Sequence, residues 1–191
     1  MKNALILHGT NGTSKGNWIP WLKAELEKVG YQVWTPDLPG ADKPSIKRYN
    51  EFLFENKDFS FNEETIIIGH SSGSVEILGL LQELLENIKI KAVYLIGSFK
   101  DNLGRDDLRE LFEEPFNFGL IKTKASKFVY FHSDDDPYCP LEHAKYLVDK
   151  TNGELIILPG QKHFNISTAG EKYKKFPELL EKIKENLEQV L

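Results

Sequence analysis

The chain has 191 residues, with 24 Lys and Arg against 29 Asp and Glu, so its net charge is −5. Its 40% of hydrophobic residues is enough for one globular domain over residues 1–191 and too many for a disordered chain. An acidic chain lacks the basic surface of a nucleic-acid binder, and one cysteine, Cys139, excludes an intrachain disulfide and a four-cysteine metal site.

Short apolar runs alternate with segments in which apolar residues recur at helical spacing. The predicted elements, in chain order, are strand 4–7, helix 18–29, strand 31–35, helix 45–56, strand 65–68, helix 75–87, strand 92–96, strand 128–131, helix 141–148, strand 155–158 and helix 176–191. Such alternation predicts an α/β fold: a six-stranded, mostly parallel sheet with helices on both faces. No run approaches the ~20 apolar residues of a membrane span, and no signal-peptide pattern follows Met1, so we expect a cytoplasmic protein.

One connection is longer than a minimal helical crossover. Residues 99–126 separate two predicted strands and carry Phe112, Phe116 and Phe118. We predict that this segment forms a small cap or lid over the site. The three phenylalanines are candidate substrate-binding residues, with ordinary core packing as the alternative.

The segment Gly69-His70-Ser71-Ser72-Gly73 matches the pattern G-x-S-x-G between a predicted strand and a predicted helix. In such a nucleophile elbow the serine lies in a strained turn, and side chains at positions 69 and 73 would clash with the neighbouring backbone. Ser71 is therefore the candidate nucleophile. The backbone N–H of Ser72, at the helix start, is a candidate oxyanion-hole donor. A simple turn without a catalytic role is the alternative.

A serine hydroxyl needs a base within hydrogen-bond reach. In α/β-hydrolases the order along the chain is serine, acid, histidine, and only His143 and His163 fit it well. His143 lies in a predicted helix, seven residues after Asp136, and the two would hardly meet across an imidazole. His163 follows the last predicted strand, at the sheet edge where ligands bind, and is the candidate base.

Three consecutive aspartates, Asp134, Asp135 and Asp136, follow the fifth predicted strand, and each is a candidate for the orienting acid. Asp136 is favoured because Pro140, four residues on, begins the next predicted helix, the usual pattern after the acid in this fold. Since like charges repel, the outer two aspartates are expected to face water or cap the helix start. A metal site with His132 is the rival hypothesis; we expect no metal and no cofactor.

The first predicted strand ends at His8, which we expect to position the glycine-rich loop 9–16 that follows. In this fold that loop supplies the second oxyanion donor, and the candidates are Thr10 first and Asn11 second. Neither a P-loop nor a dinucleotide-binding loop fits, because the required glycine and lysine spacing is absent. Asn11 and Trp18 are candidate substrate-binding residues, although Trp18 also fits the packing face of the next helix.

Several of these motifs together resemble the small α/β-hydrolases of the retinoblastoma-binding protein 9 and YdeN-like serine hydrolase family. The resemblance covers nearly the whole chain and depends on residues 17–22, residues 65–73, Asp135-Asp136-Pro137 with Pro140, and Gly160-x-x-His163-Phe164. It implies a compact six-stranded α/β-hydrolase core that lacks the first two strands of larger hydrolases. It also implies that Ser71, Asp136 and His163 form the triad.

Two departures limit what the resemblance implies. The family tends to carry tryptophan in the cap region, where this chain has Phe112, Phe116 and Phe118, so substrate preference does not transfer. The human family member takes its name from binding through a Leu-x-Cys-x-Glu motif, and this motif is absent around Cys139. No protein partner is therefore carried over.

We therefore expect a serine hydrolase that cleaves small or short-acyl carboxylic esters through a Ser-His-Asp triad and an acyl-enzyme. The expected partner is a small-molecule ester, and neither a nucleic acid nor a membrane. Two alternatives stay open because a fold does not prove turnover. One is a catalytically idle, protein-binding hydrolase fold, and the other is an amidase or peptidase with the same triad.

Overall fold

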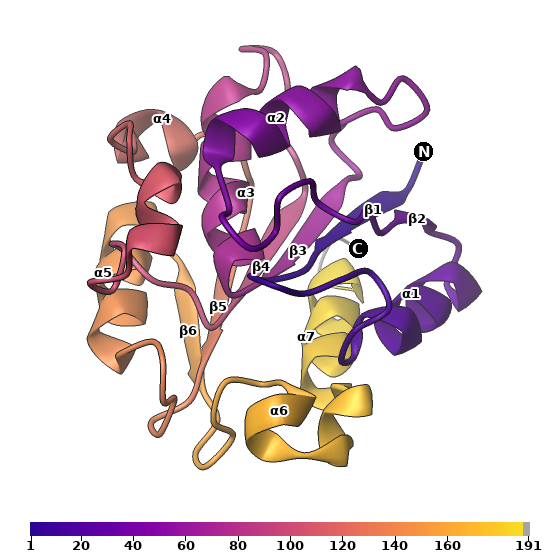
Figure 1. The fold of residues 1–191 in the computed structure, drawn as a ribbon. Coiled ribbons are helices and arrows are strands. Elements are labelled where there is room, and N and C mark those ends of the chain that lie inside the picture. The colour runs from indigo at the N-terminus through magenta and orange to yellow at the C-terminus, as the bar shows by residue number, and fades with distance from the viewer. Residues whose placement is uncertain (189–191) are drawn as a thin grey trace.

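A six-stranded sheet runs through the centre of the computed structural model, which describes residues 1–188 (Figure 1). The strands are β1 (Asn3–Leu7), β2 (Gln32–Trp34), β3 (Ile66–His70), β4 (Ala92–Ile96), β5 (Phe128–His132) and β6 (Glu154–Ile157). Their order is β2-β1-β3-β4-β5-β6, and each pairing is parallel. The predicted α/β fold is confirmed.

The central strands are buried on both faces of the sheet. Successive residues of β1 alternate between two cores: Ile6 packs into one apolar cluster, and Leu5 and Leu7 into the other. The same alternation places Ile66 and Ile68 of β3 opposite Ile67. Because both faces are covered, these strands are continuous apolar runs in the sequence, which is typical of parallel sheets.

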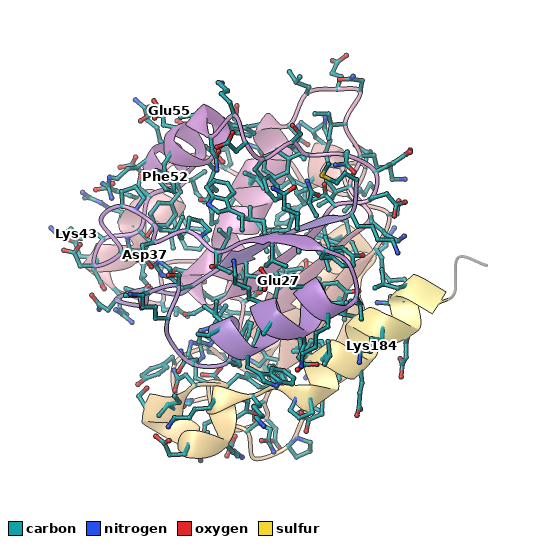
Figure 2. The ribbon with its side chains drawn as sticks, turned by 90° about the vertical axis from the view of Figure 1, so that its right-hand side faces the viewer. Glu27, Asp37, Lys43, Phe52, Glu55 and Lys184 are labelled. Carbon is teal, nitrogen blue, oxygen red and sulfur yellow. The ribbon has the colours of Figure 1, made fainter. Side chains whose placement is uncertain are left out.

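Helices form the two outer layers. One face carries α1 (Ile19–Lys28) and α7 (Pro177–Glu188), which Figure 2 shows side by side with Glu27 and Lys184 labelled. The other face carries α2 (Ile46–Glu55), α3 (Ser72–Glu83), α4 (Phe118–Ile121) and α5 (Leu141–Thr151). The last three residues of the predicted helix 176–191 lie outside the described residues. In the part of the chain that the structure describes, no helix has the length and apolar character needed to span a membrane.

The segment 99–126 contains the 3₁₀ helix η1 (Asp106–Leu111) as well as α4. Leu108 and Leu111 of η1 are buried against Val75 at the start of α3 and against Phe99. The segment is therefore held against the part of α3 that follows Ser71. That it acts as a lid stays a prediction.

The strand order creates a crevice at one edge of the sheet. From β1 the chain crosses to β2 on one side, whereas from β3 it crosses to β4 on the other side. The carboxyl ends of β1 and β3 meet where these connections diverge, which is the position at which open α/β sheets bind ligands. The loop 9–16 and Ser71 both follow strands that end there.

Glu76 of α3 is fully buried, and both of its carboxyl oxygens lack a hydrogen-bond partner among the described residues. Burial raises the pKa of Glu76 well above its ordinary value of 4.5. Above pH 4.5 the carboxyl ionises in the unfolded chain but stays protonated in the folded protein, so the free energy of unfolding falls as the pH rises. We expect Glu76→Met to raise the free energy of unfolding at pH 7.5 by ~1–3 kcal/mol.

Urea unfolding at pH 7.5 and pH 5 measures this effect, and the gain should be smaller at pH 5. Glu83→Met, at an exposed position of the same helix, is the matched control and should change stability by less than ~0.5 kcal/mol. A Glu76→Met protein less stable than wild type at both pH values would contradict the argument.

Candidate active site

Ser71 occupies a sharp turn between β3 and α3, with φ +55° and ψ −123°. A Cβ atom on Gly69 would lie 2.5 Å from the carbonyl oxygen of Gly73, and one on Gly73 would overlap the carbonyl oxygen of His8. The N–H of Ser71 donates to the carbonyl of Ile96 at 2.8 Å. The predicted requirement for glycine at positions 69 and 73 is confirmed, and the turn holds Ser71 in a backbone conformation that L-residues rarely adopt.

His8 positions the glycine-rich loop, as predicted. Its Nε2 accepts the N–H of Leu38 at 2.9 Å, and its Nδ1 donates to the carbonyl of Gly9 at 2.9 Å. Burial lowers the pKa of His8, which keeps the ring neutral in this arrangement. Gly9 then lies directly against Ser71, the candidate nucleophile, because a Cβ at Gly9 would be 2.8 Å from the Cβ of Ser71.

The same loop is joined to the start of α3. The Thr10 hydroxyl donates to the hydroxyl of Ser72 at 3.0 Å. The N–H of Asn11 donates to the carbonyl of Ala41 at 2.8 Å. A backbone N–H bound in this way is not available to a substrate oxygen, so the geometry favours Thr10 over Asn11 as the second oxyanion donor.

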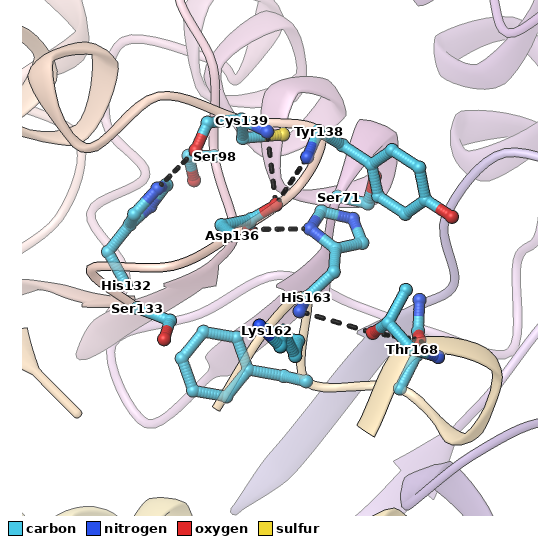
Figure 3. Close-up of polar contacts among 12 residues, drawn as sticks. Ser71, Ser98, His132, Ser133, Asp136, Tyr138, Cys139, Lys162, His163 and Thr168 are labelled. Atoms are coloured by element: carbon cyan, nitrogen blue, oxygen red, sulfur yellow. Dashed lines mark hydrogen bonds and ion pairs between the residues drawn. The ribbon is translucent and has the colours of Figure 1, made fainter. Parts of the chain in front are cut away.

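His163 and Asp136 form a buried pair (Figure 3): Nδ1 of His163 donates to Oδ2 of Asp136 at 2.7 Å. Oδ1 of Asp136 accepts the N–H groups of Tyr138 at 2.9 Å and Cys139 at 3.0 Å. Burial alone would raise the pKa of Asp136, but the bond from His163 and the two N–H groups bring it below its ordinary value. The ionised carboxylate fixes the tautomer of His163 and leaves Nε2 as a proton acceptor.

The other two aspartates bind the loop that carries His163. Asp134 accepts the N–H of Gly160 at 2.9 Å. Asp135 accepts the N–H of Lys162 at 2.9 Å and pairs with its ammonium at 2.8 Å. The bond from that ammonium, helped by Ser133 and the Lys162 N–H, lowers the pKa of Asp135 to about 2. Asp134 is exposed and the Asp135 side chain is 34% exposed, so both face water as expected. Donors of the facing loop, which the sequence did not predict, offset the repulsion between the carboxylates.

Trp18 does not line the pocket. It is fully buried, and its Nε1 donates to the carbonyl of Phe164 at 3.1 Å. The expectation of a substrate-binding role is wrong for this residue, because the indole is turned into the core between α1 and α7. It supports the segment next to His163.

His70 supports His163, a role that the sequence did not predict. Its Nε2 donates to the carbonyl of His163 at 2.8 Å, and the two ring centroids lie 4.9 Å apart. The residues are 93 positions apart in the chain, so no local pattern could have linked them. His70 thus holds the backbone of the histidine that Asp136 orients.

Ser71 and His163 line one pocket of about 710 Å³. Asn11 lies on its wall, and Phe99, Leu103 and Leu108 contribute apolar surface. That Asn11 binds substrate stays a prediction.

Phe112, Phe116 and Phe118 do not line this pocket. They form a chain of ring contacts that starts at Phe99 and ends at Tyr146 of α5, which directs them away from Ser71. The prediction that these three residues bind substrate is therefore wrong, and the alternative of ordinary packing holds.

A larger hollow of about 980 Å³ lies between α2 and α3 and is bordered by Phe116. None of the described residues that line it is a serine, cysteine or histidine, so it offers no nucleophile or base of the kind found beside Ser71. The smaller pocket is therefore the candidate active site.

A metal ion is a poor fit to this site. The ligand atoms of Asp136, Cys139 and His163 lie within 4.8 Å of one another. However, Asp136 and His163 already bind each other, and burial raises the pKa of the Cys139 thiol well above its ordinary value. Metals bind the thiolate form of cysteine, and Cys139 is held as the neutral thiol. We therefore interpret the three residues as an acid–base pair, Asp136 and His163, beside a structural cysteine.

The burial of His70 predicts a pH dependence of stability. Burial, with the nearby His163, lowers the pKa of His70 from 6.5 to about 3. The stabilisation from a neutral His70 is complete above pH 6.5 and is lost as the pH falls toward 3. Between pH 7 and pH 5 we expect wild type to lose ~2 kcal/mol more than His70→Gln, which cannot take up a proton. Urea unfolding at both pH values measures this, and equal losses would contradict it.

The parallel sheet, the serine in a strained turn after β3 and the histidine after β6 define an α/β-hydrolase. The profile of the serine hydrolase family matches residues 4–185, and the chain belongs to this family and is a hydrolase. The family resemblance found in the sequence is confirmed.

Two curated relatives span most of the chain. Serine hydrolase RBBP9 of Rattus norvegicus is 27% identical over 167 residues, which are 84% of this chain and 86% of that protein. The putative hydrolase YdeN of Bacillus subtilis is 25% identical over 164 residues, 85% of this chain and 86% of that protein. The crystal structure of the ydeN gene product superimposes with a TM-score of 0.90 at 23% identity, over 98% of this chain and 100% of that one.

Proposed function

We propose that this serine hydrolase cleaves small carboxylic esters through a covalent acyl-enzyme, with Ser71 as nucleophile, His163 as base and Asp136 as orienting acid. The observation that carries the proposal is the 2.7 Å bond between His163 and Asp136 in the pocket that also exposes Ser71. Nucleophile, base and orienting group thus come together from three separate loops.

The chemistry follows from these positions. Oγ of Ser71 attacks the ester carbonyl while Nε2 of His163 takes the hydroxyl proton. The tetrahedral intermediate collapses, the C–O bond to the alcohol breaks, and His163 returns the proton to the leaving oxygen. Water then attacks the acyl-enzyme, again with His163 as base, and releases the acid. Asp136 stays ionised throughout and stabilises the imidazolium.

The N–H groups of Ser72 and Thr10 are the proposed oxyanion-hole donors. Ser72 is the first residue of α3, so its N–H has no acceptor within the helix. The hydroxyl bond between Thr10 and Ser72 fixes the two backbones relative to each other. Donors fixed in advance stabilise the developing oxyanion without reorganisation.

The pocket size and its wall support short acyl groups. Polar side chains, among them Asn11, Asn17 and Asn165, contribute much of the lining. We expect kcat/KM for 4-nitrophenyl acetate and butyrate to exceed that for the dodecanoate by at least about tenfold, since a long chain would leave the pocket. Faster turnover of the dodecanoate would contradict this preference.

Intact mass after incubation with a fluorophosphonate tests the proposal directly. Folded wild type should gain one adduct, and a digest should place it on the peptide containing Ser71. Protein unfolded in urea before labelling is the control and should stay unmodified, because an isolated serine hydroxyl is a weak nucleophile.

No adduct on the folded protein would favour the alternative of an idle, protein-binding hydrolase fold. An adduct together with faster cleavage of anilides than of esters would favour the amidase or peptidase.

A further inference from the structure

The wall of the Ser71 pocket carries a positive charge, although the chain as a whole is acidic. Arg105 is the one side chain of fixed charge among the described residues that line it, and no Asp, Glu or Lys lies on that wall. The chain as a whole carries a net charge of −5. Arg105 therefore presents the one fixed positive charge on the described pocket wall to an anionic group, and its partner Asp107, which lies outside that wall, compensates part of this charge.

The guanidinium of Arg105 is held in place before any substrate binds. The backbone N–H of Arg105 donates to the carbonyl of Asn102 at 2.8 Å, which fixes the start of η1. Nε and Nη2 of Arg105 donate to the two carboxyl oxygens of Asp107 at 3.1 Å and 2.5 Å. A guanidinium has five N–H donors, so Nη1 and the second hydrogen of Nη2 stay available. The side chain is 45% exposed, which leaves it accessible from the pocket.

Arg105 also lies close to the catalytic groups. It shares the pocket wall with Tyr138 and Cys139, whose N–H groups bind Asp136. The charge of Arg105 opposes the rise that burial causes in the pKa of the Cys139 thiol, as expected for neighbouring groups. A substrate that spans from Ser71 to this wall would reach the free face of the guanidinium.

We propose that the Ser71 pocket selects esters that carry a carboxylate remote from the scissile bond, and that Arg105 binds this carboxylate. The inference rests on the proposed hydrolase chemistry and adds its substrate class. A planar guanidinium matches a carboxylate in charge and geometry, whereas it repels a cationic substrate. Asp107 binds two N–H groups of Arg105, on Nε and Nη2, and thereby orients the remaining N–H groups of the guanidinium.

Two matched pairs of esters test the proposal. The first pair is the mono-4-nitrophenyl ester of adipic acid and methyl 4-nitrophenyl adipate. The acyl group carries a free carboxylate in the first compound and a neutral methyl ester in the second. 4-Acetoxybenzoate is compared with methyl 4-acetoxybenzoate, which places the carboxylate on the leaving group. In at least one pair, kcat/KM should favour the acid by at least about tenfold, mainly through KM.

Variants then show whether Arg105 produces the preference. Arg105→Gln should bring the ratio of acid to methyl ester close to one, and Arg105→Lys should restore part of it. Arg109→Gln is the matched control, because Arg109 is exposed on η1 and lies outside the pocket; it should keep the wild-type ratio. Raising the ionic strength should reduce the wild-type ratio.

A wild-type ratio of one or less in both pairs would overturn the proposal, as would an unchanged ratio in Arg105→Gln. If no ester is cleaved at all, including the methyl esters, the proposed function fails. In that case calorimetric titration of Ser71→Ala with monomethyl adipate still tests the carboxylate site. Binding that Arg105→Gln weakens at least about tenfold supports the site, and absent or unaltered binding removes it.

Discussion

Ser71→Ala is expected to lower kcat/KM for 4-nitrophenyl acetate by at least about 10⁴-fold. The variant removes the oxygen that is proposed to form the acyl-enzyme but keeps the Ser72 N–H, the His163–Asp136 pair and the pocket. Release of 4-nitrophenolate under pseudo-first-order conditions measures the loss. Activity close to that of wild type would show that another group is the nucleophile.

The same variant should fold normally. The strained φ of Ser71 is set by the surrounding backbone and by the glycines at 69 and 73, none of which the substitution alters. We expect the free energy of unfolding to change by less than ~0.5 kcal/mol. Urea unfolding of both proteins provides the control that separates lost chemistry from lost structure.

Asp136→Asn is expected to lower kcat by about 10³–10⁴-fold. Oδ1 of Asp136 accepts two backbone N–H groups, from Tyr138 and Cys139, so the amide oxygen of asparagine would take that position. The amide NH₂ would then face Nδ1 of His163 and donate to it. The imidazole proton would move to Nε2, and the ring could no longer act as base toward Ser71. Steady-state kinetics from pH 6 to 9 measures the loss.

Asp135→Asn is the matched comparison, one residue away. Its carboxylate binds Lys162 rather than the His163 ring, and an amide oxygen can still accept the Lys162 N–H. We expect kcat to fall by less than about fivefold. The opposite order, with Asp135→Asn severe and Asp136→Asn mild, would show that Asp135 orients the base.

Local patterns in the sequence were sufficient to predict the sheet and the elbow. Continuous apolar runs such as residues 65–68 can only be buried on both faces, and their alternation with helices leads to a parallel sheet. Glycine at positions 69 and 73 follows from sterics within one turn, and His163 from its place after the last strand. Each of these inferences depends on neighbours in the chain or on a rule that applies to every parallel sheet.

The direction of individual side chains was decided by tertiary contacts. Trp18 and Phe112 belong to segments that line the pocket with other residues, yet both side chains pack against apolar neighbours outside it. Asp134 and Asp135 bind a loop more than 20 residues away, and His70 binds His163 across 93 residues. Arg105 reaches the pocket only because η1 is fixed against α3. The sequence by itself determined the fold and the candidate nucleophile and base. Only the packed structure decided which polar groups support them and what surrounds a substrate, because those contacts join residues with no local relationship.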